Sequence, residues 1–154
     1  MFNIVLFQPE IPPNTGNVIR LAANTGCRLH LIEPLGFEID EKRVRRAGLD
    51  YHEMSEVYRW PDWETFLRQT DAKRLFAFTT KAQRSCYDAE FMTGDTLVFG
   101  PETRGLPKEL LAALPIEQKL RLPMQPTSRS LNLSNTVAIA LYEALRQTGF
   151  TGLT

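Results

Sequence analysis

Short apolar runs alternate with segments of helical spacing along almost the whole of this chain. Strand character is predicted at Asn3–Phe7, Arg28–Glu33, Arg74–Thr80, Thr96–Gly100 and Lys119–Pro123, and more weakly near Val57–Trp60. Strands that alternate with helices are typical of an α/β fold, in which helices cover both faces of a mainly parallel sheet. The 154 residues contain no internal repeat and no long linker. We therefore expect a single domain over residues 1–154.

The helical segments begin and end at residues that commonly cap helices. Asp40, Asp62 and Pro107 precede or open helical spacing, and Gly26 and Gly48 follow it. The predicted helices are Thr15–Thr25, a segment from Asp40 to Ala47, Glu64–Gln69, Lys108–Leu114 and Ser134–Gln147. The last has the clearest apolar stripe.

Three polar loops follow predicted strands directly. They read QPEIPPNTGN after the first strand, FGPETRGLP after the run at Thr96, and PMQPTSRSLNLSN after the last strand. Ligands of open parallel sheets bind at the carboxyl ends of the strands. The three loops therefore predict one composite site.

The charge and cysteine content exclude several classes of partner. Eighteen basic and eighteen acidic residues cancel, so a nucleic acid would have to be held by a local patch. Four cations lie within Lys42–Arg46, which as an isolated run is also typical of a solvated helix face. Cys27, Cys86, His30 and His52 are isolated and predict no metal site. The chain shows neither a signal peptide nor a membrane span, so we expect a cytoplasmic protein without a membrane partner.

Several common catalytic motifs are missing from the sequence. There is no G-x-G-x-x-G after the first strand, no P-loop and no G-x-S-x-G nucleophile elbow. The loops carry amides, hydroxyls and arginines instead, which suit a flat polar ligand and a phosphate backbone. Plainer interpretations stay open: Glu102 and Arg104 could form a surface ion pair, and one of Asn132, Ser134 and Asn135 could be a helix cap. Arg20 could be a solvated helix arginine.

Three longer stretches together resemble the motifs of the SPOUT family of RNA methyltransferases. They are NTGNVIRLAANTG (14–26), LVFGPETRGLP (97–107) and LPMQPTSRSLNLSNTVAIALYEALR (122–146), and the match extends through IEPLGF, RRAGLDYHE and FAFTTK. The chain is most similar to the minimal branch that methylates the ribose 2′-OH of the wobble nucleotide, cytidine or uridine 34, in tRNA. The resemblance implies a deep trefoil knot near the C-terminus, although knots are otherwise essentially absent from proteins.

The same resemblance implies a cofactor, S-adenosylmethionine, bound in the knot without a metal. We expect Gly100 to let the backbone approach the cofactor. Glu102 either binds the cofactor or braces its loop through Arg104. The residues that we expect at the cofactor are Phe78, Thr80, Gly100, Glu102, Leu122, Met124, Ser130 and Leu131.

For catalysis, the arginine of the first motif, Arg20, is expected to act on the ribose hydroxyl. Since arginine stays protonated, it stabilises a developing alkoxide at least as plausibly as it removes a proton. The family also implies a homodimer that binds tRNA. The expected RNA contacts are Asn14, Arg43, Arg46, Arg129 and Tyr142, and for Tyr142 packing at the dimer seam is an equal alternative. Two alternatives remain: methylation at another tRNA or ribosomal RNA site, and a knotted RNA-binding protein without catalysis.

Overall fold

A seven-stranded sheet in which each strand pairing is parallel forms the centre of the computed structural model, which describes residues 1–50 and 52–154. Tyr51, within the RRAGLDYHE match, lies outside the described residues. The strand order is β3-β2-β1-β6-β4-β7-β5. The strands are β1 (Asn3–Phe7), β2 (Arg28–Ile32), β3 (Val57–Trp60), β4 (Leu75–Phe78), β5 (Arg84–Ser85), β6 (Thr96–Phe99) and β7 (Lys119–Arg121). The predicted parallel α/β architecture is confirmed.

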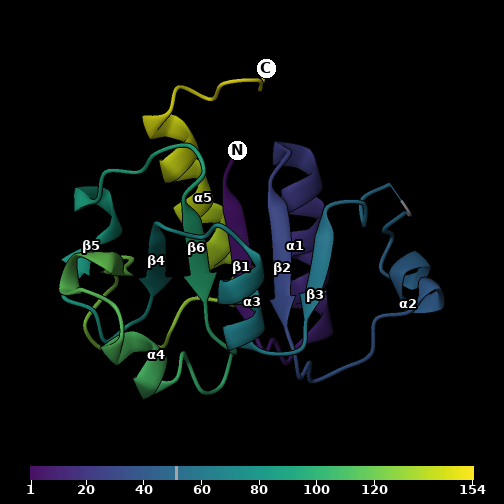
Figure 1. The fold of residues 1–154 in the computed structure, drawn as a ribbon, viewed down its shortest axis with the longest axis horizontal. Coiled ribbons are helices and arrows are strands. Elements are labelled where there is room, and N and C mark those ends of the chain that lie inside the picture. Colours follow the sequence, from purple (N-terminus) through teal and green to yellow (C-terminus); the bar gives the residue numbers. More distant parts are fainter. Residues whose placement is uncertain (51) are drawn as a thin grey trace.

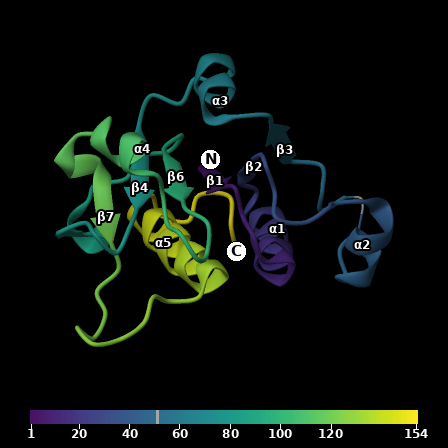
Figure 2. The same cartoon turned by 90° about the horizontal axis from the view of Figure 1, so that it is seen from below.

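Helices cover both faces of this sheet. They are α1 (Pro12–Thr25), α2 (Glu41–Arg46), α3 (Trp63–Gln69), α4 (Lys108–Ala112) and α5 (Leu133–Gln147), with short 3₁₀ turns η1 (Cys86–Asp88) and η2 (Ile116–Gln118). Helices α1 and α5 lie on one face, α3 and α4 lie on the other, and α2 projects beyond β3 (Figure 2). No helix in the described part of the chain is long and apolar enough to cross a membrane.

The near-continuous apolar sequence of β1 follows from this layering. Ile4 and Leu6 belong to the core beneath α1 and α5, whereas Val5 and Phe7 belong to the core beneath α3 and α4. All four side chains are buried. A central parallel strand with helices on both faces needs apolar residues on both of its sides.

Helix α1 begins at Pro12, three residues before the predicted start at Thr15. Pro12 and Pro13 fit its first turn, because proline has no backbone N–H to leave unpaired there. Asn14 and Thr15 consequently lie on the helix and are buried. Arg20 falls in the third turn, roughly 12 Å along the axis from Pro12 at 1.5 Å per residue.

The carboxyl ends of the central strands lie along one edge of the sheet, and both chain termini lie at the opposite edge (Figure 1). After β7 the chain runs through a long loop and enters α5, which packs beside α1 (Figure 2). The three polar loops predicted to meet are therefore on the same edge of the sheet.

Candidate active site

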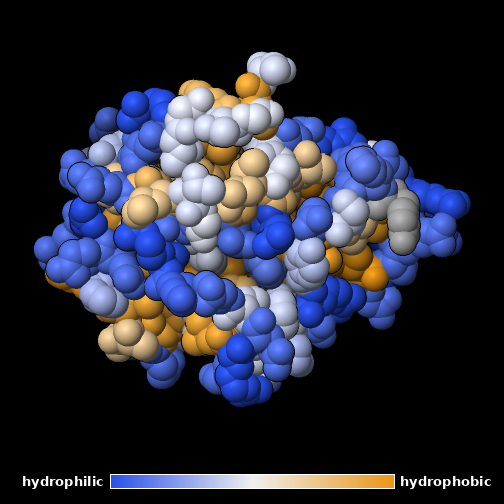
Figure 3. Space-filling view, turned by 45° about the horizontal axis from the view of Figure 1, so that its top comes forward, coloured by the Kyte–Doolittle hydropathy of each residue, from blue (hydrophilic) through white to orange (hydrophobic). Residues whose placement is uncertain are grey.

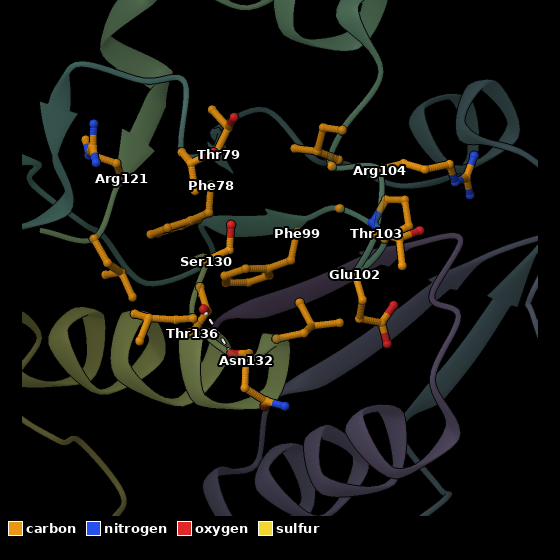
Figure 4. A pocket seen from close by; sticks show the side chains of 18 of the residues that line it. Phe78, Thr79, Phe99, Glu102, Thr103, Arg104, Arg121, Ser130, Asn132 and Thr136 are labelled. Carbon is orange, nitrogen blue, oxygen red and sulfur yellow. Dashed lines mark hydrogen bonds between the residues drawn. The ribbon is translucent and has the colours of Figure 1, made fainter. Parts of the chain in front are cut away.

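A cavity of about 480 Å³ opens where β4, β6 and β7 end. Its walls come from the loops after these strands and from the start of α5 (Figure 4). The lining includes each residue that the sequence led us to expect at the cofactor: Phe78, Thr80, Gly100, Glu102, Leu122, Met124, Ser130 and Leu131. The volume lies within the range of small-molecule sites, roughly 300 to 1,000 Å³.

Two stacked phenylalanines form an apolar wall of this cavity. Phe78 and Phe99 are paired in register on neighbouring strands, and their ring centroids are 4.8 Å apart with planes at 16°. Both rings point into the space between the loops (Figure 4). Polar side chains that the sequence analysis did not select also line the cavity; they are Thr79, Lys81, Arg121 and Thr136. An apolar wall with a polar rim suits a flat, polar-edged ligand.

Gly100 is required by the loop in which it lies. A Cβ atom at this position would lie 2.5 Å from the backbone nitrogen of Leu106 and 2.6 Å from the carbonyl carbon of Gly105. The loop after β6 turns back on itself at this point, and Gly105 has a φ of 70°. Closure of the loop is therefore a reason for the glycine in addition to the expected one, approach to the cofactor.

Glu102 accepts hydrogen bonds from the N-terminal end of α1. Its Oε1 atom accepts from the backbone N–H of Glu10 at 2.8 Å, and its Oε2 accepts from the N–H of Ile11 at 2.9 Å. The Asn14 side-chain amide donates to the same Oε2 at 3.2 Å. The sequence left open an ion pair between Glu102 and Arg104. In the structure Arg104 pairs with Glu10 instead, at 3.5 Å.

The hydrogen bonds continue from Asn14 to α5. Asn132 Nδ2 donates to Asn14 Oδ1 at 3.0 Å, and Asn132 Oδ1 caps α5 by accepting from the N–H of Asn135 and the hydroxyl of Ser134. Of the three cap candidates Asn132, Ser134 and Asn135, Asn132 is the N-cap of α5. Asn14, expected at the RNA, is instead buried with both ends of its amide bonded inside the protein.

Arg20 does not line the cavity. Its Nε lies 3.2 Å from Glu53 Oε2, and its Nη2 donates to the backbone carbonyl of Gly48. The sequence led us to expect Arg20 at the ribose hydroxyl. In the structure α1 starts earlier than predicted, and the α2–β3 segment holds this guanidinium at the side of the helix. The earlier start is indicated by Pro12 and Pro13, both of which suit a first helical turn.

The basic residues expected at RNA lie outside the cavity. Arg43 is paired with Glu38 at 2.7 Å and with Asp40 at 3.4 Å, and these carboxylates raise the pKa of its guanidinium. Arg46 and Arg129 are exposed and form no ion pair within the described residues. Tyr142 is half exposed on the outer side of α5.

The isolated cysteines and histidines occupy structural positions. Cys27 and Cys86 are buried free thiols, and burial raises the pKa of Cys86 to about 11. His30 is buried, and His52 is exposed. Across residues 1–50 and 52–154, no group of three His, Cys, Asp or Glu residues is placed to hold a metal ion.

Comparison with known proteins gives close relatives over the whole chain. The model of the SpoU rRNA Methylase family matches residues 1–142. The chain is 62% identical to a tRNA (cytidine(34)-2′-O)-methyltransferase of Aeromonas hydrophila, covering 99% of this chain and 97% of the relative. It is 60% identical to the protein of that name from Escherichia coli K12, with the same coverage.

Solved structures show the same fold. One, described as giving insights into the 2-OH methylation of C/U34 on tRNA, is 47% identical, with a TM-score of 0.88 and coverage of 96% of both chains. Another is the SpoU methyltransferase AviRb from Streptomyces viridochromogenes in complex with AdoMet. It is 26% identical with a TM-score of 0.76, and the match covers 95% of this chain and 57% of that one.

Proposed function

Because the chain belongs to the SpoU rRNA methylase family, we propose that it methylates the ribose 2′-hydroxyl of nucleotide 34, cytidine or uridine, in the anticodon loop of tRNA. The observation that carries this proposal is the 62% identity, over 99% of the chain, to a relative named for methylation of cytidine 34. The proposal treats residues 1–154 as one methyltransferase domain acting on tRNA in the cytoplasm. Methylation at another RNA site and RNA binding without catalysis have no comparable support.

The proposed methyl donor is S-adenosylmethionine, and the cavity residues fit it. The stacked Phe78 and Phe99 offer an apolar surface to an adenine face. Leu122 and Leu131 also line the cavity, and their backbone groups are the proposed partners of the polar edges of adenine. When bound, the cofactor supplies a methyl group already activated on a sulfonium. The chain needs to hold the ribose oxygen in line and stabilise its charge.

We also propose that the segment after β7 is threaded as the family knot. Two observations support this. The segment from Leu122 to Leu131 and the loop after β6 line the same cavity. Helix α5 then packs beside α1 and against β6. The proposed knot requires that the segment from Leu122 to Leu131 passes through the loop after β6, beside which it lies.

Arg20 is the proposed catalytic residue, acting as an electrostatic stabiliser of the 2′-alkoxide. Glu53 and the Gly48 carbonyl hold its guanidinium at the side of α1. Because Arg20 does not line the cavity of its own chain, this role requires bound tRNA or a second chain to bring a ribose hydroxyl to it. An arginine held in this way presents a fixed positive charge without a change of protonation.

In the proposed complex, exposed cations of the protein bind tRNA near its unpaired anticodon loop. Arg129 lies on the loop before α5, and Arg43 and Arg46 lie on α2. Cations of this kind bind phosphates without sequence preference, so base selection is left to the single-stranded loop. The face of the molecule in Figure 3 is largely hydrophilic, with apolar side chains in separate patches. The basic residues therefore act as local patches on a chain without net charge.

A homodimer completes the proposal. The outer side of α5 exposes Ile139 and Tyr142, and Phe150 lies 6.3 Å from the Tyr142 ring. These three side chains stay 39–47% exposed within the described chain. A second copy that packs on them would bury this surface.

The chemistry of the proposal is tested by incubating tRNA with the protein and methyl-labelled cofactor. Digestion to nucleosides should place the label in 2′-O-methylcytidine or 2′-O-methyluridine. Label in a methylated base would contradict ribose methylation, and absence of transfer with retained RNA binding would favour the non-catalytic alternative.

A further inference from the structure

Two acidic side chains hold the wall of the cofactor cavity to the start of α1 in a reciprocal arrangement. Glu102, on the loop after β6, accepts from the backbone of Glu10 and Ile11. Glu10, on the loop after β1, accepts from the N–H and the hydroxyl of Thr103 at 2.9 and 2.8 Å. Each loop therefore supplies a carboxylate to the backbone of the other. We call these two contacts, with the Glu102–Asn14–Asn132 chain, the carboxylate clamp.

Each hydrogen bond of the Glu102 chain points in one direction. Donors of α5 bond to Asn132, Asn132 donates to Asn14, and Asn14 donates to Glu102. A carboxylate can only accept hydrogen bonds, so Glu102 can end this series of donors. Its place at the end fixes the orientation of the Asn14 and Asn132 amides. Glu102 receives three donors within the protein. Its acceptor capacity is therefore largely committed before a ligand enters.

From this geometry we infer that Glu10 and Glu102 are positioning residues, which shape the cofactor cavity by holding its loop to α1 and α5. The inference deepens the proposed function and rests on it, because the cavity is taken to bind S-adenosylmethionine. It decides between the two roles considered for Glu102: the carboxylate braces the loop, and its backbone partners are Glu10 and Ile11, just before α1, rather than Arg104.

The two carboxylates respond differently to replacement by glutamine. The Thr103 N–H bonds to Glu10 Oε1, and the Thr103 hydroxyl lies within reach of both Glu10 oxygens, at 2.8 and 3.0 Å. The single carbonyl oxygen of Glu10→Gln can accept both Thr103 donors, and its NH₂ group replaces only the oxygen that lies 3.5 Å from the exposed Arg104 guanidinium. The three donors on Glu102 are divided between its two oxygens. In Glu102→Gln, one donor therefore faces the new NH₂ group in either orientation of the amide, and a hydrogen bond becomes a donor–donor contact.

The test is titration calorimetry with S-adenosylhomocysteine, the unreactive product, on four variants. Glu102→Gln and Glu10→Ala should weaken binding on the order of tenfold or more, the cost of one or two unmade hydrogen bonds. Glu10→Gln should bind within about twofold to threefold of wild type. Glu109→Ala, which removes an exposed acid on α4, is the control and should bind as wild type.

Two further readouts separate positioning from general structure. For Glu10→Ala, the loss should appear in KM for the cofactor, with kcat at saturating cofactor and tRNA kept within about threefold. Amide hydrogen exchange should show faster exchange at Thr103 in Glu10→Ala and restored protection in Glu10→Gln. Exchange at Glu10 and Ile11 should rise in Glu102→Gln. If Glu102→Gln does not fold, the Glu10 pair carries the test alone.

Wild-type binding in Glu10→Ala, with unchanged exchange at Thr103, would overturn the inference. Unimpaired binding in Glu102→Gln would overturn the inference as well. A glutamine could still accept from a hydroxyl of the cofactor, so this result would indicate that Glu102 contacts the ligand directly and does not brace the loop. Failure of the wild-type protein to bind S-adenosylhomocysteine would contradict the proposed function instead, and hydrogen exchange would still report on the clamp.

Discussion

The Arg20 side chain is fixed at both ends of its guanidinium, by Glu53 and by the Gly48 carbonyl. If it stabilises the 2′-alkoxide, Arg20→Ala should lower kcat on the order of a hundred- to a thousandfold with little change in cofactor Kd. Arg20→Lys should be nearly as damaging, because an ammonium cannot pair with Glu53 and the carbonyl in the same planar geometry. Single-turnover kinetics with saturating tRNA measures both.

The matched control for Arg20 is Arg43→Ala in the basic segment of α2. Arg43 is exposed and paired with Glu38, so its loss should weaken tRNA binding and reduce its salt dependence while kcat at saturating tRNA is retained. Wild-type turnover of Arg20→Ala under the same saturating conditions would show that Arg20 contributes to binding and not to catalysis.

His30 makes the stability of the fold depend on pH. Burial, together with the nearby charge of Arg28, lowers its pKa to about 4. Its Nδ1 accepts from the Trp60 indole, and its Nε2 contacts Asn3 Oδ1 at 3.1 Å. Protonation of Nδ1 would place a new N–H against the Trp60 N–H, which donates to that atom. The unfolded chain, with a histidine pKa near 6.5, binds more protons in this window, so stability should fall as the pH drops from about 6.5 to about 4.

The shift corresponds to roughly 3 kcal/mol of unfolding free energy over the whole window. Urea denaturation at pH 7 and pH 4.5 should show this loss in the wild type. In His30→Gln, which does not titrate, the difference between the two pH values should shrink by most of that amount. An equal pH dependence in both proteins would contradict the assignment to His30.

At the scale of elements, the loop after β6 depends on Gly100. Gly100→Ala would place its Cβ 2.5 Å from the Leu106 backbone nitrogen, so it should destabilise the protein and distort the cavity wall. Gly16→Ala is the matched control, because its Cβ would meet only Ala47 Cβ at 3.9 Å. Within α1 it should be neutral or stabilise by about 0.5 to 1 kcal/mol. Thermal denaturation that ranks the two variants in the opposite order would refute this explanation.

Much of the element order could be predicted because the strands are buried on both faces and the helices have caps. Asp40 and Asp62 cap α2 and α3 through the N–H of Arg43 and Thr65, as their positions indicated. Strand β5 could not be found, since the two residues Arg84–Ser85 form no period. Its pairing with β7 is a tertiary contact that local sequence does not encode.

The residues that line the cavity could be predicted because they lie in sequence motifs. The hydrogen bonds between residues far apart in the sequence could not be predicted. Glu10 and Thr103 are 93 positions apart, and Glu102 and Asn14 are 88 apart. No spacing rule connects such pairs. The same limit applies to Arg20, whose partner Glu53 lies on a separate segment 33 residues away.

For the whole molecule, a homodimer is the expected state in solution. Sedimentation at micromolar concentration should give twice the chain mass of 17.6 kDa. Tyr142→Glu should dissociate the dimer, because it places a charge among Ile139 and Phe150 on the outer side of α5. Leu141→Ala, at the buried neighbour, should instead cost about 2 to 5 kcal/mol of folding stability. A wild-type monomer that methylates tRNA would refute the dimer.

The central claim concerns one oxygen atom in the substrate, and fragment mass spectrometry of treated tRNA tests it most directly. tRNA incubated with the protein and S-adenosylmethionine is cut into oligonucleotides, and the anticodon-loop fragment is sequenced by mass. We expect one added methyl group on the ribose of nucleotide 34, and loss of that signal in Arg20→Ala. A methyl group on another nucleotide, or on the base of nucleotide 34, would contradict it.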